Sequence, residues 1–360
     1  MSRQVDLAIT GLGLVLPCGD GLENARASLA SGQPCFADLP AALGQGRGAA
    51  CTAFNPAGII PPMQLRRLDR PSRFAWVAAH QAFLDAGLDP KPAGERIAVA
   101  VGTMTGGSEA SEAFMRPYFQ RGPEGASPMV FPNCVANAAS GHLALAFGLK
   151  GPSATFVDRE NAAFVALEQA ARWLRAGLAD AALVIGTDGL FPVLQDLCRG
   201  ARLLDRQGDP EVGSGRGFLT GEGAQAFVLE PRERAEARGA RPRALLRGLA
   251  ARSPVAPSEA ARAESLAAAV LALGAFPPAC RIGGGNGLTR LDAVEARLAA
   301  AHPEWPAALH PKVLWGELAG SGGPLLAAAL LQPAGLVLVT APASSGVQFA
   351  ARLEGLRLDP

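Results

Sequence analysis

The side chains best able to do chemistry in this chain are six cysteines and four histidines, and they are scattered along it. No two cysteines have Cys-x-x-Cys spacing, so the sequence predicts neither a zinc site nor a redox motif. Scattered thiols are typically buried and reduced, and for the histidines we expect structural or surface roles. These residues are Cys18, Cys35, Cys51, Cys134, Cys198, Cys280, His80, His142, His302 and His310.

A glycine-rich stretch at residues 283–287 is a further candidate, because backbone amides of such loops can hold a phosphate. The stretch lacks the Gly-x-Gly-x-x-Gly spacing and the helix with an acidic residue that should follow it. We therefore predict no nucleotide site, and the sequence indicates no cofactor and no metal.

The overall composition argues against a nucleic-acid-binding protein and against a membrane-spanning one. The chain has 360 residues, of which 49% are hydrophobic, enough for one large core or two fused half-domains. Its 33 basic and 32 acidic residues give a net charge of +1, so we expect no nucleic-acid partner. The N-terminus has no signal-peptide core, and the most apolar stretch, 323–343, is interrupted by Pro333 and Gly335. We expect a helix and a buried strand there, no membrane span, and a cytoplasmic protein.

Short apolar strands alternate with amphipathic helices, a pattern typical of an α/β fold with sheets covered on both faces. Strands are predicted at residues 5–10, 96–102, 181–186, 226–229, 244–249, 313–315 and 336–340, the first ending in a tight turn at Gly11 and Gly13. Helices are predicted at 72–86, 161–176, 257–273 and 292–301. The charged segment 231–243 is the best candidate for a crossover between halves.

Several segments, taken in order, resemble the β-ketoacyl-acyl-carrier-protein synthase family. They are 9–13, 72–74 with 82–87, 131–133, 137–141, 148–153, the "G-F-V-x-G-E-G-A"-like turn 217–224, the "D-x-x-E" of 292–295, and Lys312-x-x-x-Gly316. The resemblance covers nearly the whole chain. It implies a thiolase fold of five layers, α-β-α-β-α, made of two similar halves. The expected halves are residues 1–235, with dimer-side insertions, and 236–360.

The same resemblance implies that the family's catalytic Cys-His-His set is lost. The family's cysteine is the tenth residue from the Gly of "G-P-x", and this position is Glu160. Its first histidine precedes the Asp of "D-x-x-E" by eight residues, which gives Gly284. Its second histidine follows the Gly after "K-x-x-x", which gives Glu317 beside the retained Lys312. The loop that normally carries a gating Phe has become 343–348.

The two acidic replacements have more than one interpretation. Glu160 at a helix N-terminus is favoured by the helix dipole and could be a cap or an ion-pair partner, for example of Arg159. It could also take part in malonyl decarboxylation. Glu317 could be a buried acid with a raised pKa. Lys312 could pair with Glu317 or with Glu160, which would turn the old active site into a salt-bridged structural core.

The resemblance implies a function in chain elongation without turnover. Chain-length factors of type II polyketide and aryl polyene systems lack the nucleophile and pair with an active ketosynthase, and an acyl carrier protein is a further possible partner. The expected interface residues are Phe131, Pro132, Asn133, Asn137, Thr155, Phe156 and Val157. Two alternatives stay open: an enzyme with altered chemistry at Glu160 or Glu317, such as a decarboxylase, and a standalone homodimeric acyl-binding or scaffold protein.

Overall fold

Ten strands of the computed structural model form one hydrogen-bonded path, with β2 (Gly19–Asp20) paired to β1 beside it and β3 (Ala37–Asp38) with β4 (Arg47–Gly48) forming a separate small sheet. The residues that the structure describes are 5–317, 320, 322–344 and 346–356. The path runs β11-β10-β12-β13-β9-β1-β8-β7-β5-β6. Its first-half strands are β1 (Leu7–Leu16), β5 (Ile97–Thr103), β6 (Ser153–Val157), β7 (Ala181–Asp188) and β8 (Gly223–Pro231). Its second-half strands are β9 (Ala244–Arg252), β10 (Cys280–Gly283), β11 (Ala308–Leu309), β12 (Gly335–Ala341) and β13 (Gln348–Gly355).

Within the described residues, the path consists of two five-stranded runs with the same internal order. The first run has the order β6-β5-β7-β8-β1 and the second has the order β11-β10-β12-β13-β9. If the strands of each run are numbered one to five along the sequence, both runs have the spatial order 3-2-4-5-1. In both runs the third, second and fourth strands are parallel, and the remaining pairs are antiparallel. A short β1–β9 pairing joins the runs, so β9 lies between β1 and β13. The predicted boundary at residues 235/236 falls in α9 (Arg232–Ala237) and stays a prediction.

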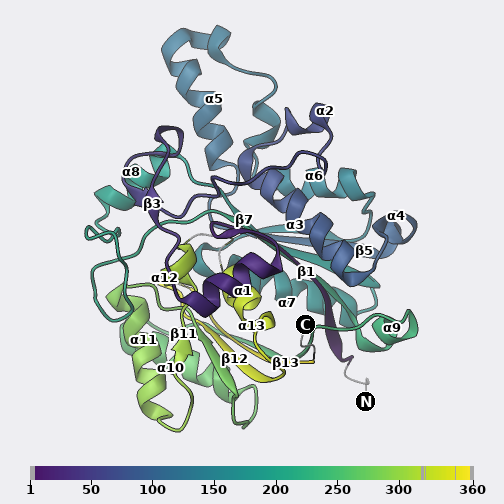
Figure 1. The fold of residues 1–360 in the computed structure, drawn as a ribbon, viewed down its shortest axis with the longest axis vertical. Coiled ribbons are helices and arrows are strands. Elements are labelled where there is room, and N and C mark those ends of the chain that lie inside the picture. The colour runs from purple at the N-terminus through teal and green to yellow at the C-terminus, as the bar shows by residue number, and fades with distance from the viewer. Residues whose placement is uncertain (1–4, 318–319, 321, 345, 357–360) are drawn as a thin grey trace.

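Helices cover both faces of each run, which confirms the predicted five layers (Figure 1). The central layer holds α7 (Ala162–Arg175) and α13 (Gly323–Leu330), of which α13 contacts strands of both runs. The outer layers hold α3 (Arg70–Ala86) on the first run, and α10 (Glu259–Leu271) with α11 (Thr289–Ala301) on the second. The remaining helices are α1 (Leu22–Ser31), α2 (Pro62–Leu65), α4 (Pro90–Ala93), α5 (Ser108–Arg121), α6 (Ala138–Phe147), α8 (Pro192–Gly200) and α12 (Lys312–Trp315).

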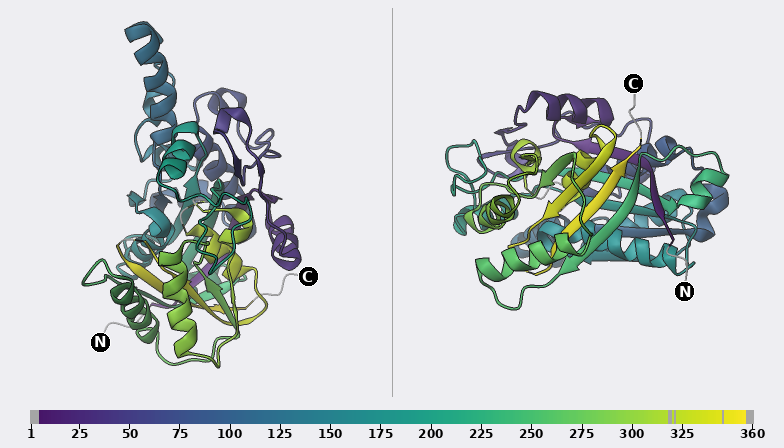
Figure 2. Two further views of the ribbon diagram at one scale, coloured as in Figure 1. Left: turned by 90° about the vertical axis from the view of Figure 1, so that its left-hand side faces the viewer. Right: turned by 90° about the horizontal axis from the view of Figure 1, so that it is seen from below.

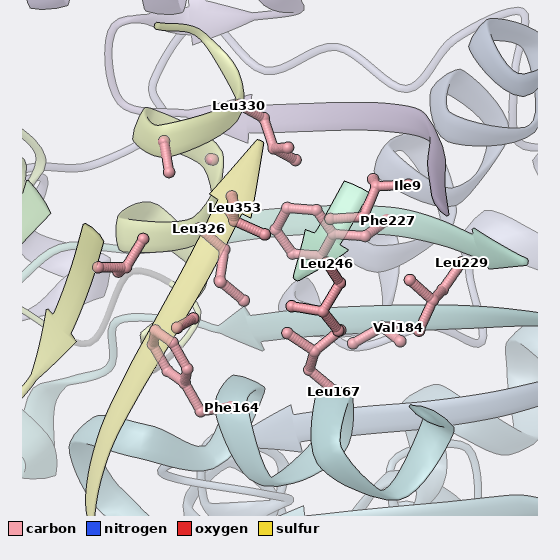
Figure 3. Close-up of a cluster of buried hydrophobic side chains, with 14 of the residues drawn as sticks. Ile9, Phe164, Leu167, Val184, Phe227, Leu229, Leu246, Leu326, Leu330 and Leu353 are labelled. Carbon is pink, nitrogen blue, oxygen red and sulfur yellow. The ribbon is translucent and has the colours of Figure 1, made fainter. Parts of the chain in front are cut away.

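The largest apolar cluster lies around the central helices (Figure 3). Phe164 and Leu167 of α7 and Leu326 of α13 pack there with strand residues such as Ile9 and Phe227. Each of these side chains is fully buried, which stabilises the fold by about 1.5–3 kcal/mol per large side chain. Separate clusters lie under α3 and under α10 and α11, so each outer helical layer has its own apolar cluster.

The first strand differs from its predicted form. β1 does not turn at Gly11 and Gly13 but continues, fully buried, to Leu16. A Cβ at Gly13 would lie 1.9 Å from the carbonyl oxygen of Ala78 in α3, and one at Gly11 would lie 2.1 Å from that of Ala82. The two glycines therefore allow α3 to pack directly on the strand backbone. Glycine is needed here for close packing and not for a turn.

Other segments also differ from the sequence-based expectation, among them α1, α6 and α8, which were not predicted. Residues 313–315, predicted as a strand, belong to the short helix α12, which starts directly after Pro311. The helix α5 was not predicted, and Figure 2 shows it projecting beyond the rest of the molecule. The predicted helix and strand within 323–343 are confirmed as α13 and β12. No helix among the described residues is both long and apolar enough to span a membrane.

Candidate functional site

Glu160 lies in the turn that connects β6 to α7, within the short helix η5 (Arg159–Asn161). The turn is tight, since Arg159 has a φ of 28°, a left-handed conformation that is strained for a residue with a side chain. The turn places Glu160 just before the N-terminus of the central helix α7, where its side chain is buried. This is the predicted position, at the tip of a buried helix.

The carboxylate of Glu160 is bound by the loop that follows β12. The hydroxyl of Ser344 donates to its Oε1 at 2.5 Å, although the residues are 184 positions apart. Asn161 strengthens this connection, because its side-chain amide donates to the carbonyls of Ala341 and Val347, both at 2.9 Å. The second oxygen of Glu160, Oε2, is buried and has no hydrogen-bond partner among the described residues. The predicted cap or Arg159 ion pair is not what holds Glu160; the loop hydroxyl is.

The glycine loop 283–287 is held by the two acids of the "D-x-x-E" segment in α11. Asp292 accepts hydrogen bonds from the backbone amides of Gly213, Asn286 and Gly287, and Glu295 accepts from the amide of Gly284 at 3.0 Å. The loop leaves no room for a side chain, since a Cβ on Gly284 would lie 2.7 Å from Cδ of Pro342. An imidazole at this position would require the loop to move.

Lys312 and Glu317 form a buried ion pair, which confirms one of the two predicted pairings. Nζ of Lys312 lies 2.9 Å from Oε1 of Glu317, and the two side chains are 2% and 3% exposed. The side-chain amide of Asn286, from the glycine loop, donates to Oε2 of Glu317 at 2.5 Å. Because both carboxylate oxygens have partners, Glu317 is a fixed anion of a polar cluster. We call Lys312, Glu317 and Asn286 the lysine cluster.

A cysteine that the sequence analysis did not single out lies near this cluster. Cys198 of α8 is buried, and burial, followed by the negative charge of Glu317, raises the pKa of its thiol to about 11. The group therefore stays protonated at neutral pH and is a poor nucleophile. Its position could not be read from the sequence, because no motif connects α8 with residue 317.

The histidines lie apart from Glu160 in the contacts that the structure describes. His310 packs against the glycine loop, since a Cβ on Gly283 would lie 2.5 Å from its ring. His142 hydrogen bonds to Asn133 at 2.8 Å, and burial lowers the pKa of His142. His302 stacks on Trp305 with ring centroids 3.7 Å apart. Within the described residues, no histidine hydrogen bonds to a cysteine.

The predicted interface residues are not equally exposed. β6 is the edge strand of the path, paired only with β5 among the described strands. Phe131 and Val157 are 62% and 57% exposed. Asn133 is buried and binds the carbonyl of Arg67 and the ring of His142, so it supports the surface from below. Thr155 donates to the hydroxyl of Ser140. Pro132 and Asn137 are exposed, and Phe156 is partly buried against the central core.

An apolar groove of about 790 Å³ lies between α5 and α8. Met104, Phe119 and Leu197 are among its lining residues, and Phe119 and Leu197 are largely exposed. The opposite side of α5 is attached to the η4 helix (Phe131–Asn133) by a ring contact between Phe114 and Phe131, with centroids 5.4 Å apart. The projecting helix α5 therefore lines the groove on one side and contacts the exposed Phe131 on the other.

Comparison with known proteins gives a family for the first two thirds of the chain. Residues 4–235 match the family model described as "Beta-ketoacyl synthase, N-terminal domain". Among curated proteins, the chain is 29% identical to 3-oxoacyl-[acyl-carrier-protein] synthase 2 of Staphylococcus aureus, over 67% of this chain and 61% of that protein. It is also 29% identical to the enzyme of the same name from Synechocystis, over 65% and 60%. The chain thus spans about three fifths of the length of these relatives.

Solved structures match the fold over nearly its full length. A structure titled "The ishigamide ketosynthase/chain length factor" has a TM-score of 0.85 at 23% identity, and covers 99% of this chain and 100% of its own. A β-ketoacyl synthase from Burkholderia phymatum has a TM-score of 0.86 at 19% identity, with 98% and 100% covered. A type II polyketide ketosynthase bound to its acyl-carrier protein has a TM-score of 0.79 at 19% identity, also with 98% and 100% covered. These likenesses establish a shared fold.

Proposed function

This chain belongs to the β-ketoacyl synthase family, and we propose that it is a non-catalytic member of it, a chain-length-factor-like subunit that pairs with an active ketosynthase. The observation that carries the proposal is the lysine cluster. At the position where the resemblance places the second histidine, Glu317 is neutralised by Lys312 and bound by Asn286. The Glu317 carboxylate, held by Lys312 and Asn286, cannot donate a hydrogen bond to a thioester carbonyl as an imidazole would.

The other two positions support the same conclusion. Condensation by this family needs a thiolate to carry the acyl group and imidazoles to polarise the thioester carbonyl. Glu160 offers a carboxylate that is already bound by Ser344, and the backbone around Gly284 has no space for a ring. A subunit without the thiolate and without both imidazoles needs a partner to supply them.

The surface carries a face suited to such a partner. Exposed apolar side chains gather on α5, η4 and β6, elements that are connected through contacts with one another and with α6. We call this the dimer-side face, and its members are Tyr118, Phe131 and Val157, with Met129 and Val135 in the turns that flank η4. Monomeric proteins rarely expose large contiguous apolar patches, and an open edge strand such as β6 tends to be paired. A related synthase subunit would cover both features.

The groove between α5 and α8 supports the role in setting chain length. It is apolar and is carried by the same helix as the dimer-side face. An acyl chain that grows in the partner and passes α5 would enter the groove, where side chains such as Met115 and Phe119 would bound its length. In the proposed function, α5 would contact the partner subunit and would also line the groove that limits the length of the acyl chain.

The test is co-expression with the ketosynthase encoded beside this chain, followed by size-exclusion chromatography and an elongation assay. We expect one heterodimer peak and products whose length depends on this subunit. Phe131→Asp should abolish co-elution, whereas the control Leu271→Asp, at an even more exposed position on α10, should not. The proposal fails if the ketosynthase alone makes products of the same length at the same rate. A homodimer that ignores the synthase would favour a standalone scaffold.

A second candidate function rests on the free oxygen of Glu160. Oε2 is buried without a partner among the described residues, and a pocket of about 590 Å³ reaches its partner Ser344. The pocket is also lined by Arg262 and Arg290, which could hold an anionic acyl substrate such as a malonyl thioester. In this case the chain would be a decarboxylase. Decarboxylation of malonyl-carrier protein by the isolated chain, lost in Glu160→Gln but kept in Phe131→Asp, would support this candidate.

A further inference from the structure

A cavity of about 540 Å³ lies at the end of α10, in the outer helical layer of the second run (Figure 1). Its walls come from the last turns of α10, from the loop that follows this helix and from the segment that follows α11. These walls are mostly apolar, and they include Val270, Leu271, Phe276 and Trp305. None of the lining residues belongs to the groove beside α5 or to the lysine cluster. Cavities of this volume are typical sites for a small organic molecule.

The cavity carries a negative charge. Glu304 is the one acidic side chain among the described residues that line it, and none of these residues is a lysine or an arginine. Oε1 of Glu304 lies 3.3 Å from Nδ1 of His302, and the ring of His302 stacks on Trp305 with centroids 3.7 Å apart. The carboxylate is therefore held at the cavity by a histidine that stacking keeps in place.

Two guanidinium groups lie close to the cavity but outside its lining. Arg281 lies 5.6 Å from the ring centroid of Trp305, and Arg352 lies 4.7 Å from that of Phe276. Arg281 is buried and pairs with Glu295 at 3.5 Å, whereas Arg352 donates to a backbone carbonyl. Each arginine contacts a ring of the wall, and neither lines the cavity itself. The charge that a ligand would meet inside is therefore that of the one carboxylate.

We propose that this cavity binds a small organic ammonium ion, with the apolar body of the ligand between α10 and Trp305 and its ammonium group at Glu304. An apolar body leaves water when it enters such a cavity, and a carboxylate favours an ammonium group over a neutral or an anionic one. The site lies in a different part of the chain from the dimer-side face, so the inference does not rest on the proposed function.

The cavity is connected to the glycine loop through Arg281. The guanidinium of Arg281 contacts Trp305 and pairs with Glu295. Glu295 in turn accepts hydrogen bonds from the backbone amide of Gly284 at 3.0 Å and from the hydroxyl of Thr340 at 2.7 Å. Because the distance of 3.5 Å between Arg281 and Glu295 exceeds that of a good hydrogen bond, the pair is loosely held. We expect a ligand that displaces Trp305 to alter the loop at Gly284.

The test is calorimetric titration of the whole chain with three probes of similar shape: 4-phenylbutylammonium, 4-phenylbutanol and 5-phenylpentanoate, which are positive, neutral and negative at neutral pH. We expect saturable binding of the ammonium, weaker binding of the alcohol and the weakest binding of the carboxylate. Glu304→Gln should weaken binding of the ammonium about fivefold, the upper end for an exposed ion pair, and leave the alcohol unchanged. The control Glu264→Gln removes the same charge from an exposed position of α10 outside the cavity and should bind as the wild type does.

A second variant tests the location of the site. Ala267→Phe adds a ring at an exposed position of α10 that lines the cavity, and it should abolish binding of the ammonium and of the alcohol alike. Wild-type affinity of this variant for the ammonium would overturn the proposal, as would absence of saturable binding to the wild type. Equal binding of the three probes would also overturn it, because the cavity would then be an apolar surface without selectivity for charge.

The connection to the glycine loop has its own readout, hydrogen–deuterium exchange of the peptide that spans 283–287. Saturation with 4-phenylbutylammonium should change exchange there in the wild type but not in Ala267→Phe. Unchanged exchange in the saturated wild type would refute the connection.

Discussion

Gly316 turns the chain so that Lys312 and Glu317, five residues apart, face each other as a buried ion pair of 2.9 Å. The turn needs glycine, because φ at Gly316 is 88° and a Cβ there would lie 2.6 Å from the amide nitrogen of Gly221. The short spacing in the sequence and the turn at Gly316 together bring the two side chains into contact. Because both side chains are buried, loss of either charge should destabilise the fold.

Glu317→Gln should lower the free energy of unfolding by about 3–5 kcal/mol, because it leaves the Lys312 ammonium buried without a countercharge. Denaturant-induced unfolding measures the change. The control is the double variant Lys312→Met with Glu317→Gln, which removes both charges and should recover most of the loss. If the single variant were as stable as the wild type, the pair would not be the structural core that we infer.

Glu160→Cys should not restore condensation. A thiol at the tip of α7 still meets a loop without an imidazole at Gly284, and Glu317 remains neutralised by Lys312. The measurement is the rate of β-ketoacyl formation from acyl- and malonyl-carrier protein, with Glu160→Ala as the matched control. We expect the two variants to be indistinguishable. A rate for the cysteine variant clearly above that of the alanine variant would mean that another group replaces the histidines.

Gly13→Ala should destabilise the chain by about 1–3 kcal/mol, the usual cost of overpacking. The added methyl would press on the backbone of α3 at Ala78, and neither element can shift without disturbing the core. The midpoint of denaturant unfolding reports the loss. Gly141→Ala is the control, because a Cβ at this exposed helical position meets nothing within 4 Å and should be neutral or slightly stabilising. Equal stability of both variants would contradict the close packing of α3 on β1.

The stability of the chain should depend on pH through Glu109, in the first turn of α5. Burial, followed by the negative charges of Asp69 and Glu222, raises the pKa of Glu109 from 4.5 to about 8, against the opposing effect of Arg70. The folded state therefore binds this proton more tightly than the unfolded state. Its contribution to stability is present below pH 4.5 and is lost as pH rises toward 8.

Glu109→Gln removes this contribution, so the variant should gain stability relative to the wild type as pH rises from 5 to 8. Unfolding curves at several pH values test the difference, and other titrating groups cancel because both proteins share them. Parallel pH profiles for the two proteins would show that Glu109 titrates normally.

The sequence predicts the elements whose side chains alternate between core and solvent with a regular period. Helices 72–86 and 161–176 are of this kind and appear as α3 and α7. α5 was missed because little of it is buried: Ala110 is its one buried residue, and its apolar side chains face outward. Residues 313–315 were read as a strand because an apolar run of three cannot distinguish strand from helix.

Some contacts of the candidate site could also be predicted from the sequence, and others could not. The pairing of Lys312 with Glu317 could be predicted, since the two residues are close in sequence and opposite in charge. The hydrogen bond from Ser344 to Glu160 could not, because the loop after β12 meets the start of α7 only through the packing of the two halves.

The position of β9 between β1 and β13 has a consequence for folding during synthesis. The first run of strands is complete once Pro231 has left the ribosome. By contrast, β9 gains its second neighbour only when β13 (Gln348–Gly355), the last strand in the sequence, emerges. Until then one edge of β9 stays open to any passing strand. The nascent chain therefore passes through a stage at which the first run of strands is complete while an open edge of β9 is exposed to aggregation.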